Sequence, residues 1–250
     1  MPRELKRRLS APVSILMPVC NESEVIEEVV EEWVRDVFAH LPEGSEFLFD
    51  EAASTDGTRE ILARLAEKYP FIHVEYHDRK DGFAAAARRL YGRARCPLVF
   101  FTDSDGQYVA SDFWKLAKHI DDYDVVHGAK LGRKDALIRR VSSMCFNKLA
   151  SFLFEIHYLD INSAFRLMKA DVVREVAPRL AVMRTLLNAE LLLRCELENY
   201  AIKQVYILHR QRKHGRSRGL PTHRYLVDAF RAGWGLFKIK ESYHKSQEMS

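Results

Sequence analysis

Hydrophobic residues alternate along the chain between short continuous runs and longer stretches with a helical period. The short runs, which predict strands buried on both faces, lie at 13–17, 46–49, 71–74, 98–101 and 124–128. The stretches with apolar residues three and four positions apart, which predict amphipathic helices, lie at 25–37, 58–68, 82–94 and 111–121. Because short connections join strands and helices in strict alternation, this half of the chain predicts a parallel sheet with crossover helices.

The second half of the chain is less regular. Further helices are predicted at 135–156, 170–177, 184–198 and from about 221 to 240, and further strands at 163–168 and 202–209. Neither an internal repeat nor a linker interrupts the pattern. We therefore expect one α/β domain at 11–220, a mostly parallel sheet flanked by helices, between a basic tail at 1–10 and an amphipathic helix and tail at 221–250.

Composition narrows the class of protein. With 47% hydrophobic residues in 250, the chain has ample material for a core, and its net charge of +4 does not by itself argue for nucleic-acid binding. Cys20, Cys96, Cys145 and Cys195 lie far apart, which fits a reducing compartment and neither a zinc site nor a disulfide framework. No leader pattern and no apolar run of roughly 20 residues is present. We expect a cytoplasmic protein, with peripheral contact to a membrane left open.

Two carboxylates follow the fourth hydrophobic run directly. Asp103 and Asp105 come just after it, and Gly106 gives the backbone freedom to turn sharply. In an open α/β sheet, ligands bind beyond the carboxyl ends of the strands, and Mg²⁺ is held by one or two carboxylates together with substrate phosphates. A solvated turn uses the same residue types, so the pair alone leaves both interpretations open.

Four short motifs occur in order along the chain: Met17-Pro18-Val19-Cys20-Asn21-Glu22, Ser54-Thr55-Asp56-Gly57-Thr58, Asp103-Ser104-Asp105-Gly106-Gln107 and Arg212-Lys213-His214-Gly215-Arg216-Ser217. Together they resemble family 2 glycosyltransferases, most of all the polyprenyl-phosphate sugar transferases of the dolichol-phosphate mannose synthase kind. The resemblance covers about residues 12–220 and implies a GT-A (Rossmann-like) fold. It also implies an inverting, metal-dependent transfer of a sugar from a nucleotide-diphosphate sugar to an acceptor such as a polyprenyl phosphate.

The resemblance also implies roles for individual residues. The residues that match donor-binding positions are Pro18, Cys20, Glu22, Glu51, Asp103, Ser104, Asp105 and Gln107. The residues that match the metal positions, for Mg²⁺ or Mn²⁺, are Asp103, Asp105 and Gln107. The cations expected near the phosphates of donor or acceptor are Lys130, Arg133, Arg212 and Arg218. Such a metal would neutralise the charge that builds up on the diphosphate leaving group, so Asp105 and Arg212 are candidate catalytic residues.

The chain departs from the family pattern after its second strand. Aligned on the Ser-Thr-Asp-Gly-Thr motif, Glu51 keeps the first of two acids, whereas Ala52 replaces the second, which in the family hydrogen-bonds the nucleotide base. Ala53 replaces a glycine, and Cys20 stands where Tyr is common. Either Glu51 or Asp50 compensates, or donor affinity is reduced.

Glu190 is a third candidate catalytic residue, suggested by its position on an apolar helix face. It could act as a general base for a hydroxyl acceptor. Alternatively, it is a helix acid paired with Arg194, four residues later. Both interpretations stay open.

Two other functions are compatible with the fold class. A non-catalytic protein of the same fold, binding a nucleotide sugar or a partner, is suggested by Ala52 and Ala53. A nucleotidyltransferase would need a Gly-rich, basic loop after the first strand, and 18–22 is neither. The basic run at 209–218 belongs to no recognisable nucleic-acid module, so no nucleic-acid partner is expected.

Aromatic and basic residues share a helical period near the C-terminus. The apolar members are Tyr225, Leu226, Phe230, Trp234 and Phe237, and the basic ones are Arg224, Arg231, Lys238 and Lys240. This pattern is typical of a helix that lies in an anionic membrane interface, although a helix that packs on its own domain can show it too.

Overall fold

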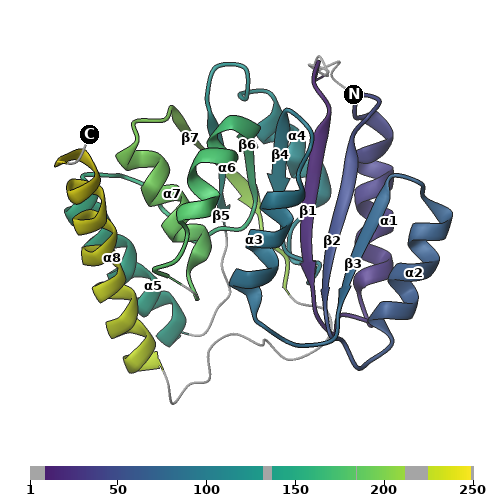
Figure 1. The fold of residues 1–250 in the computed structure, drawn as a ribbon, viewed down its shortest axis with the longest axis horizontal. Helices are drawn as coiled ribbons and strands as arrows, with labels where there is room; N and C mark the ends of the chain where they lie inside the picture. The colour runs from purple at the N-terminus through teal and green to yellow at the C-terminus, as the bar shows by residue number, and fades with distance from the viewer. Residues whose placement is uncertain (1–8, 132–136, 184, 212–224, 249–250) are drawn as a thin grey trace.

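A seven-stranded sheet forms the centre of the protein in the computed structural model, which describes residues 9–131, 137–183, 185–211 and 225–248 (Figure 1). The strands are β1 (Val13–Val19), β2 (Glu46–Ala52), β3 (Ile72–His77), β4 (Leu98–Phe101), β5 (Val125–Leu131), β6 (Arg166–Lys169) and β7 (Ile202–Leu208). Their spatial order is β3-β2-β1-β4-β6-β5-β7, and only β6 runs antiparallel to its neighbours. The predicted mostly parallel α/β sheet is confirmed.

Helices cover both faces of this sheet (Figure 1). They are α1 (Ile26–Asp36), α2 (Thr58–Lys68), α3 (Phe83–Arg93), α4 (Phe113–Ala117), α5 (Leu137–Phe154), α6 (Ala170–Val176), α7 (Leu187–Leu197) and α8 (Tyr225–Glu248). In Figure 1, α3, α6 and α7 lie in front of the sheet, α1 and α4 lie behind it, and α5 and α8 form a pair at one edge. Among the described residues, no helix has the length and apolar character needed to cross a bilayer.

An aromatic cluster joins the rear helices to the centre of the sheet. The Trp33 ring of α1 lies 5.2 Å from that of Phe100 on β4, and Phe100 lies 5.1 Å from Phe113 and 4.7 Å from Phe165 (centroid distances). All four side chains are buried, and the alternating side-chain direction along β4 and the helical period of the apolar residues in α1 bring them to one layer. This packing sets the position of the loop that follows β4.

Several elements end where the sequence did not predict. β2 continues through Asp50, Glu51 and Ala52, beyond the hydrophobic run at 46–49, because its pairing with β1 extends to Glu51 and its pairing with β3 to Ala52. The predicted helix at 111–121 reduces to a 3₁₀ turn followed by the short α4. The predicted domain boundaries, at 10 and 220, stay predictions, since 1–8 and 212–224 are outside the described residues.

Candidate active site

The two carboxylates predicted to bind a metal lie in the loop after β4. Thr102 donates its N–H to the carbonyl of Leu16 at 3.0 Å, which extends the pairing with β1 into this loop. Gly106 has a φ of +72°, and a Cβ at this position would come within 3.3 Å of the Val29 side chain. Gly106 therefore lets the chain turn directly after Asp105, as expected.

A cleft of about 590 Å³ opens beside this loop, within the size range of small-molecule sites. Its walls come from the ends of β1 and β2, the start of α3 and the loop after β4. The lining residues are Pro18, Val19, Cys20, Glu22, Ala52, Lys80, Gly82, Phe83, Ala86, Asp103, Ser104, Asp105 and Gln107. Every predicted donor-binding residue except Glu51 lines this cleft, and the lining as a whole comes from four separate segments of sequence.

Asp103 and Asp105 fit a hard divalent cation. Both line the cleft and are partly exposed, and carboxylate oxygens are the ligands that Mg²⁺ and Mn²⁺ prefer. Asp105 Oδ1 accepts the N–H of Gln107 at 3.1 Å, which holds the carboxylate against its own loop. Gln107 Nε2 donates to the carbonyl of Arg210 at 3.2 Å, so the two carboxylates are the stronger candidate ligands.

Glu51 and Asp50 are both committed to arginines outside the cleft lining. Glu51 is fully buried, and its two oxygens accept the N–H of Ser54 at 2.6 Å and of Arg59 Nε at 2.9 Å. Asp50 is also fully buried and receives two hydrogen bonds from Arg89, at 2.7 and 2.8 Å. Of the two acids that could have replaced the missing one, neither lines the cleft.

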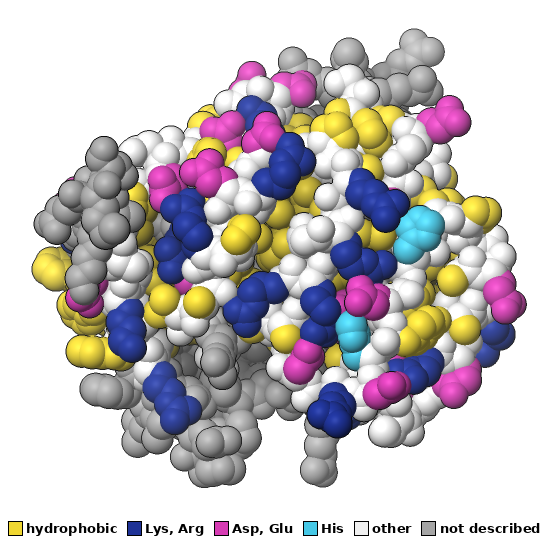
Figure 2. Space-filling view, viewed as in Figure 1, with side chains coloured by type: hydrophobic (Ala, Val, Ile, Leu, Met, Phe, Trp, Pro, Cys, Tyr) yellow, Lys and Arg dark blue, Asp and Glu magenta, His cyan; other side chains and the backbone are white. Residues whose placement is uncertain are grey.

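A second group of possible metal ligands, Asp50, Glu75 and His77, lies between β2 and β3 with its donor atoms within 4.8 Å of one another. Arg89 already occupies both oxygens of Asp50, and Arg93 Nη1 lies 2.9 Å from Glu75 Oε2. Figure 2 shows this mixture on the surface, where basic and acidic side chains surround a histidine near the carboxyl end of β3. The arginines neutralise these acids, so the pair after β4 is the better candidate metal site.

The sequence profile of glycosyl transferase family 2 matches residues 14–177, more than half of the chain. The chain belongs to glycosyl transferase family 2. It is 29% identical over 159 residues to glycosyltransferase AglJ of Haloferax volcanii, which covers 62% of this chain and 49% of AglJ. This chain therefore spans about half the length of AglJ.

Two further similarities bear on fold and subclass. A dolichyl-phosphate hexose transferase of Haloferax volcanii is 26% identical over 204 residues, covering 80% of this chain and 83% of that protein. The predicted resemblance to polyprenyl-phosphate sugar transferases is thereby confirmed. Glucosyl-3-phosphoglycerate synthase from Mycobacterium tuberculosis, crystallised with Mn²⁺, UDP and phosphoglyceric acid, superposes with a TM-score of 0.67 at 17% identity over 92% of this chain and 78% of that one. At that identity the match speaks for the fold, and the predicted GT-A fold is confirmed.

One wall of the cleft in this family 2 domain was not predicted from the sequence. It consists of Lys80, Gly82, Phe83 and Ala86, at the start of α3. The available signal was Gly82, which has a φ of +90° and directly precedes the helix. A glycine at that position marks a turn, but the sequence alone does not show which ligand-binding surface the turn faces.

The predicted phosphate-binding cations are only partly within the described residues. Arg133, Arg212 and Arg218 lie outside them. Lys130 is largely buried; its Nζ lies 3.9 Å from Asp160 Oδ2 and 5.4 Å from the centroid of the Tyr108 ring. Lys130 does not line the cleft, and its proposed contact with a phosphate stays a prediction.

Arg210, just after β7, contacts the loop that follows β4. Its N–H donates to the carbonyl of Gln107 at 2.7 Å, and its Nη1 pairs with Glu32 of α1 at 2.7 Å. This residue precedes the basic motif by two positions. Arg210 therefore lies beside the loop that carries Asp105.

The contacts of Glu190 support the interpretation that it is paired with Arg194, and they do not suit a general base. Its buried carboxylate accepts backbone N–H groups from Ala181 (3.1 Å), Val182 (2.9 Å) and Met183 (2.6 Å), and Arg194 Nε donates to it at 3.0 Å. Glu190 does not line the cleft that contains Asp103 and Asp105. The carboxylate holds the segment before α7 in place.

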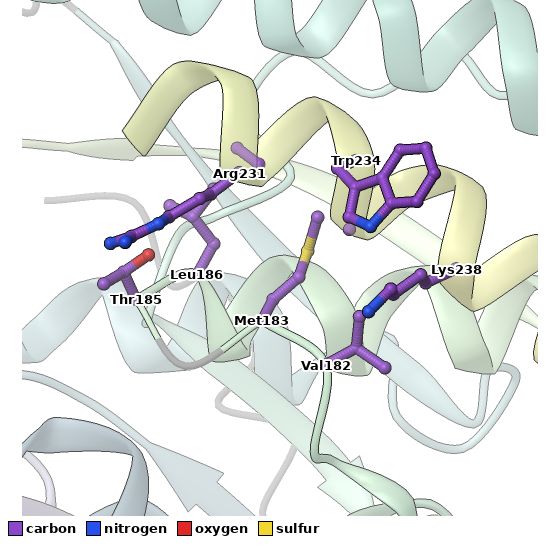
Figure 3. A pocket seen from close by; sticks show the side chains of 9 residues that line it. Val182, Met183, Thr185, Leu186, Arg231, Trp234 and Lys238 are labelled. Atoms are coloured by element: carbon purple, nitrogen blue, oxygen red, sulfur yellow. The ribbon is translucent and has the colours of Figure 1, made fainter. Parts of the chain in front are cut away.

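That segment forms the floor of a second cavity, of about 400 Å³, under α8 (Figure 3). Gly235 lets α8 approach closely, because a Cβ there would come within 2.9 Å of Met183 Cε. In Figure 3, Arg231 and Lys238 extend from α8 across the cavity toward Thr185 and Val182. Leu236 and Ile239 of α8 are fully buried, whereas Trp234 is 58% and Phe237 50% exposed. Helix α8 thus packs on the domain with one face and exposes aromatic side chains on another.

Proposed function

We propose that the protein is a metal-dependent, inverting glycosyltransferase that moves a sugar from a nucleotide-diphosphate sugar to a polyprenyl phosphate. The observation that carries the proposal is the single cleft in which Asp103 and Asp105 meet the loop after β1. Inversion and the class of acceptor are supported by the family resemblance and by the dolichyl-phosphate hexose transferase among the relatives.

Asp103 and Asp105 would hold Mg²⁺ or Mn²⁺, and the Mn²⁺ and UDP bound by the mycobacterial synthase support this choice. When bound, the metal would supply the positive charge that stabilises the departing diphosphate. The chain's own contribution is to hold both carboxylates at one edge of the sheet: the turn at Gly106 and the bond from Gln107 to Asp105 keep them there. Pro18, Cys20 and Glu22 would line the nucleoside.

A phosphate acceptor is favoured over a hydroxyl acceptor by the chemistry of the site. A phosphate is already anionic at neutral pH, so it attacks without a general base, whereas a hydroxyl needs one. Glu190, the base considered above, is committed to three backbone N–H groups and Arg194. Cations supply what a phosphate needs, and Lys130, Arg133, Arg212 and Arg218 are the proposed ones.

Peripheral contact with the cytoplasmic face of a membrane is part of this proposal. Figure 2 shows hydrophobic side chains at the edge of the molecule where α5 and α8 lie, and Phe152 of α5 is 81% exposed. Trp234 and Phe237 of α8 lie among Arg231 and Lys238, a combination suited to anionic headgroups. Such a surface would bring a lipid-linked acceptor close to the enzyme.

The alternative is a protein that binds a nucleotide sugar without catalysis. Ala52 supports it, because β2 contributes no acid to the cleft lining and both Asp50 and Glu51 are paired with arginines. Weak donor binding would follow unless another contact replaces the lost hydrogen bond.

Two measurements test the proposal. Thermal unfolding with a panel of nucleoside diphosphates, with and without Mn²⁺, should reveal a metal-dependent ligand; at 100 times its dissociation constant, a ligand adds about 2.7 kcal/mol to the free energy of unfolding. Transfer of labelled sugar to a short-chain polyprenyl phosphate should then be lost in Arg212→Ala. A metal-dependent shift without transfer to any acceptor would favour the binding protein, and no shift at all would contradict both functions.

A further inference from the structure

The cleft from which the family's acid is missing at Ala52 is also lined by an exposed aromatic ring, that of Phe83. We propose that Phe83 is the platform on which the nucleobase of the donor stacks, so that the base is held by its faces and not read by a carboxylate. The inference deepens the proposed function and rests on it. If Phe83 has this role, the protein discriminates only weakly between nucleobases.

Phe83 is exposed but fixed in place. It is the first residue of α3, lines the cleft and is 38% exposed. Its ring packs edge-to-face against Phe101, with 5.9 Å between ring centroids and an interplanar angle of 86°. Phe101 is the last residue of β4, two positions before Asp103. The ring is therefore held at a set position relative to the candidate metal ligands.

The segment that carries Phe83 is also fixed by charge. Arg89 of α3 bonds Asp50 of β2 at 2.7 and 2.8 Å and reaches Asp81 with Nη2 at 3.2 Å. Hydrogen bonds from Arg89 lower the pKa of Asp81, so this link persists through the neutral pH range. Arg89 thus joins the strand that ends at Ala52 to the turn before Phe83. A stacking surface that is already ordered loses little conformational entropy when it binds a ligand.

The end of β2 offers the cleft little for hydrogen bonding through side chains. Ala52 lines the cleft there beside Pro18 and Cys20 at the end of β1, and the Cys20 thiol already donates to the carbonyl of Ala52 at 3.3 Å. Glu51, the neighbouring acid, accepts hydrogen bonds from Ser54 and Arg59. A base that stacks on Phe83 therefore finds no carboxylate at the end of β2, and the acid of the loop after β1 that lines the cleft is Glu22.

Stacking and carboxylate recognition have different consequences for specificity. Base–aromatic stacking tolerates any base, because every base has a π-face, whereas a carboxylate accepts a hydrogen bond from the N3–H of uracil and repels the N3 lone pair of cytosine. With stacking alone, UDP and CDP should bind with affinities within about fivefold of each other. Removing the Phe83 ring should lower the affinity for either nucleotide roughly 5- to 150-fold, the range measured for loss of one base-stacking contact.

Calorimetry in the presence of Mn²⁺ tests this with three ligands: UDP, CDP and inorganic pyrophosphate. In Phe83→Ala, affinity for UDP and CDP should fall at least fivefold while affinity for pyrophosphate, which has no base, stays within twofold. Phe83→Tyr should restore nucleotide binding. Tyr206→Ala, which removes an exposed ring of β7 that does not line the cleft, serves as the matched control and should leave the affinity for all three ligands unchanged.

A gain-of-function variant tests the effect of the missing acid at position 52. Ala52→Asp supplies the missing acid, so it should strengthen UDP binding relative to CDP by tenfold or more. Unchanged UDP affinity in Phe83→Ala, with pyrophosphate still bound, would overturn the stacking role and leave the proposed function intact. Strong preference of the unmodified protein for UDP over CDP, above fiftyfold, would overturn it as well. If neither nucleotides nor pyrophosphate bind with Mn²⁺, the proposed function itself fails, and the inference with it.

Discussion

Replacement of Glu190 by Gln removes one of two carboxylate oxygens that hold the segment before α7. Oε2 accepts N–H groups from Val182 and Met183 at 2.9 and 2.6 Å, and Oε1 accepts from Ala181 and Arg194 at 3.1 and 3.0 Å. The amide of Gln can offer its oxygen to only one of these two pairs. The other pair of donors then faces an NH₂ group, which is itself a donor.

The expected cost follows from burial. A buried donor left without an acceptor costs about 1–3 kcal/mol, and breaking a buried ion pair from one side costs about 3–5 kcal/mol. Glu190 is fully buried and Arg194 nearly so, which places the change at about 3–5 kcal/mol of unfolding free energy. In a chain of this size, that lowers Tm by about 6–20 °C.

Urea unfolding followed by circular dichroism measures this loss as a lower midpoint at unchanged slope. Asp171→Asn is the matched control: it breaks an ion pair with Arg174 that is exposed at the surface of α6, so its effect should stay within about 0.5 kcal/mol. A double-mutant cycle with Arg194→Leu should reveal a coupling that is absent from the exposed pair.

Turnover distinguishes this structural role from catalysis. At a temperature where Glu190→Gln is folded, its rate per folded molecule should lie near that of the unmodified protein. A variant with an unchanged urea midpoint and a hundredfold lower turnover, with donor still bound, would refute the reasoning and restore the general base.

Three other outcomes are expected. Asp105→Asn should abolish Mn²⁺-dependent binding of the donor in calorimetry while the circular dichroism spectrum stays the same; unchanged binding would remove the metal role. Burial, together with the nearby charge of Arg166, holds the pKa of His127 well below its usual 6.5, so the folded protein keeps this ring neutral. The unfolded chain takes up a proton at this histidine below pH about 6.5. The free energy of unfolding should therefore keep its full value above that pH and fall by as much as about 1.4 kcal/mol per pH unit below it. His127→Phe should flatten this slope in urea titrations at pH 5 to 7, whereas a slope that persists would assign it to other groups. Truncation at Leu220 should reduce co-sedimentation with anionic liposomes, and equal binding of the full and truncated chains would exclude α8 as the membrane contact.

Much of the fold could be predicted from local pattern. Short hydrophobic runs and helical periods located the strands and most of the helices, because burial on two faces and burial on one face leave different periods in the sequence. Because ligands bind beyond the carboxyl ends of parallel strands, Asp103 was expected at a ligand site, and the family resemblance assigned Cys20 and Glu22 to the same donor site. The cleft brings them together as expected.

The hydrophobic pattern did not predict where a strand that contains buried charged residues ends. Asp50 and Glu51 interrupt the apolar pattern of β2, yet the strand continues through them because Arg89 and Arg59 neutralise their carboxylates. Those arginines lie 39 and 8 positions further along. No local pattern contains such pairs, since their partners meet only when the helices have packed on the sheet.

Which direction a side chain faces was decided by tertiary structure. The sequence placed Glu190 on an apolar helix, where a buried acid suits either a base or an ion pair, and only the packing of the preceding segment supplied the three N–H groups that bind it. Phe83 read as the start of a helix and proved to face the cleft. Periodicity and motif spacing depend on neighbours along the chain and therefore specify elements and their order. The contents of a cleft depend on neighbours across space, and these exist only in the folded protein.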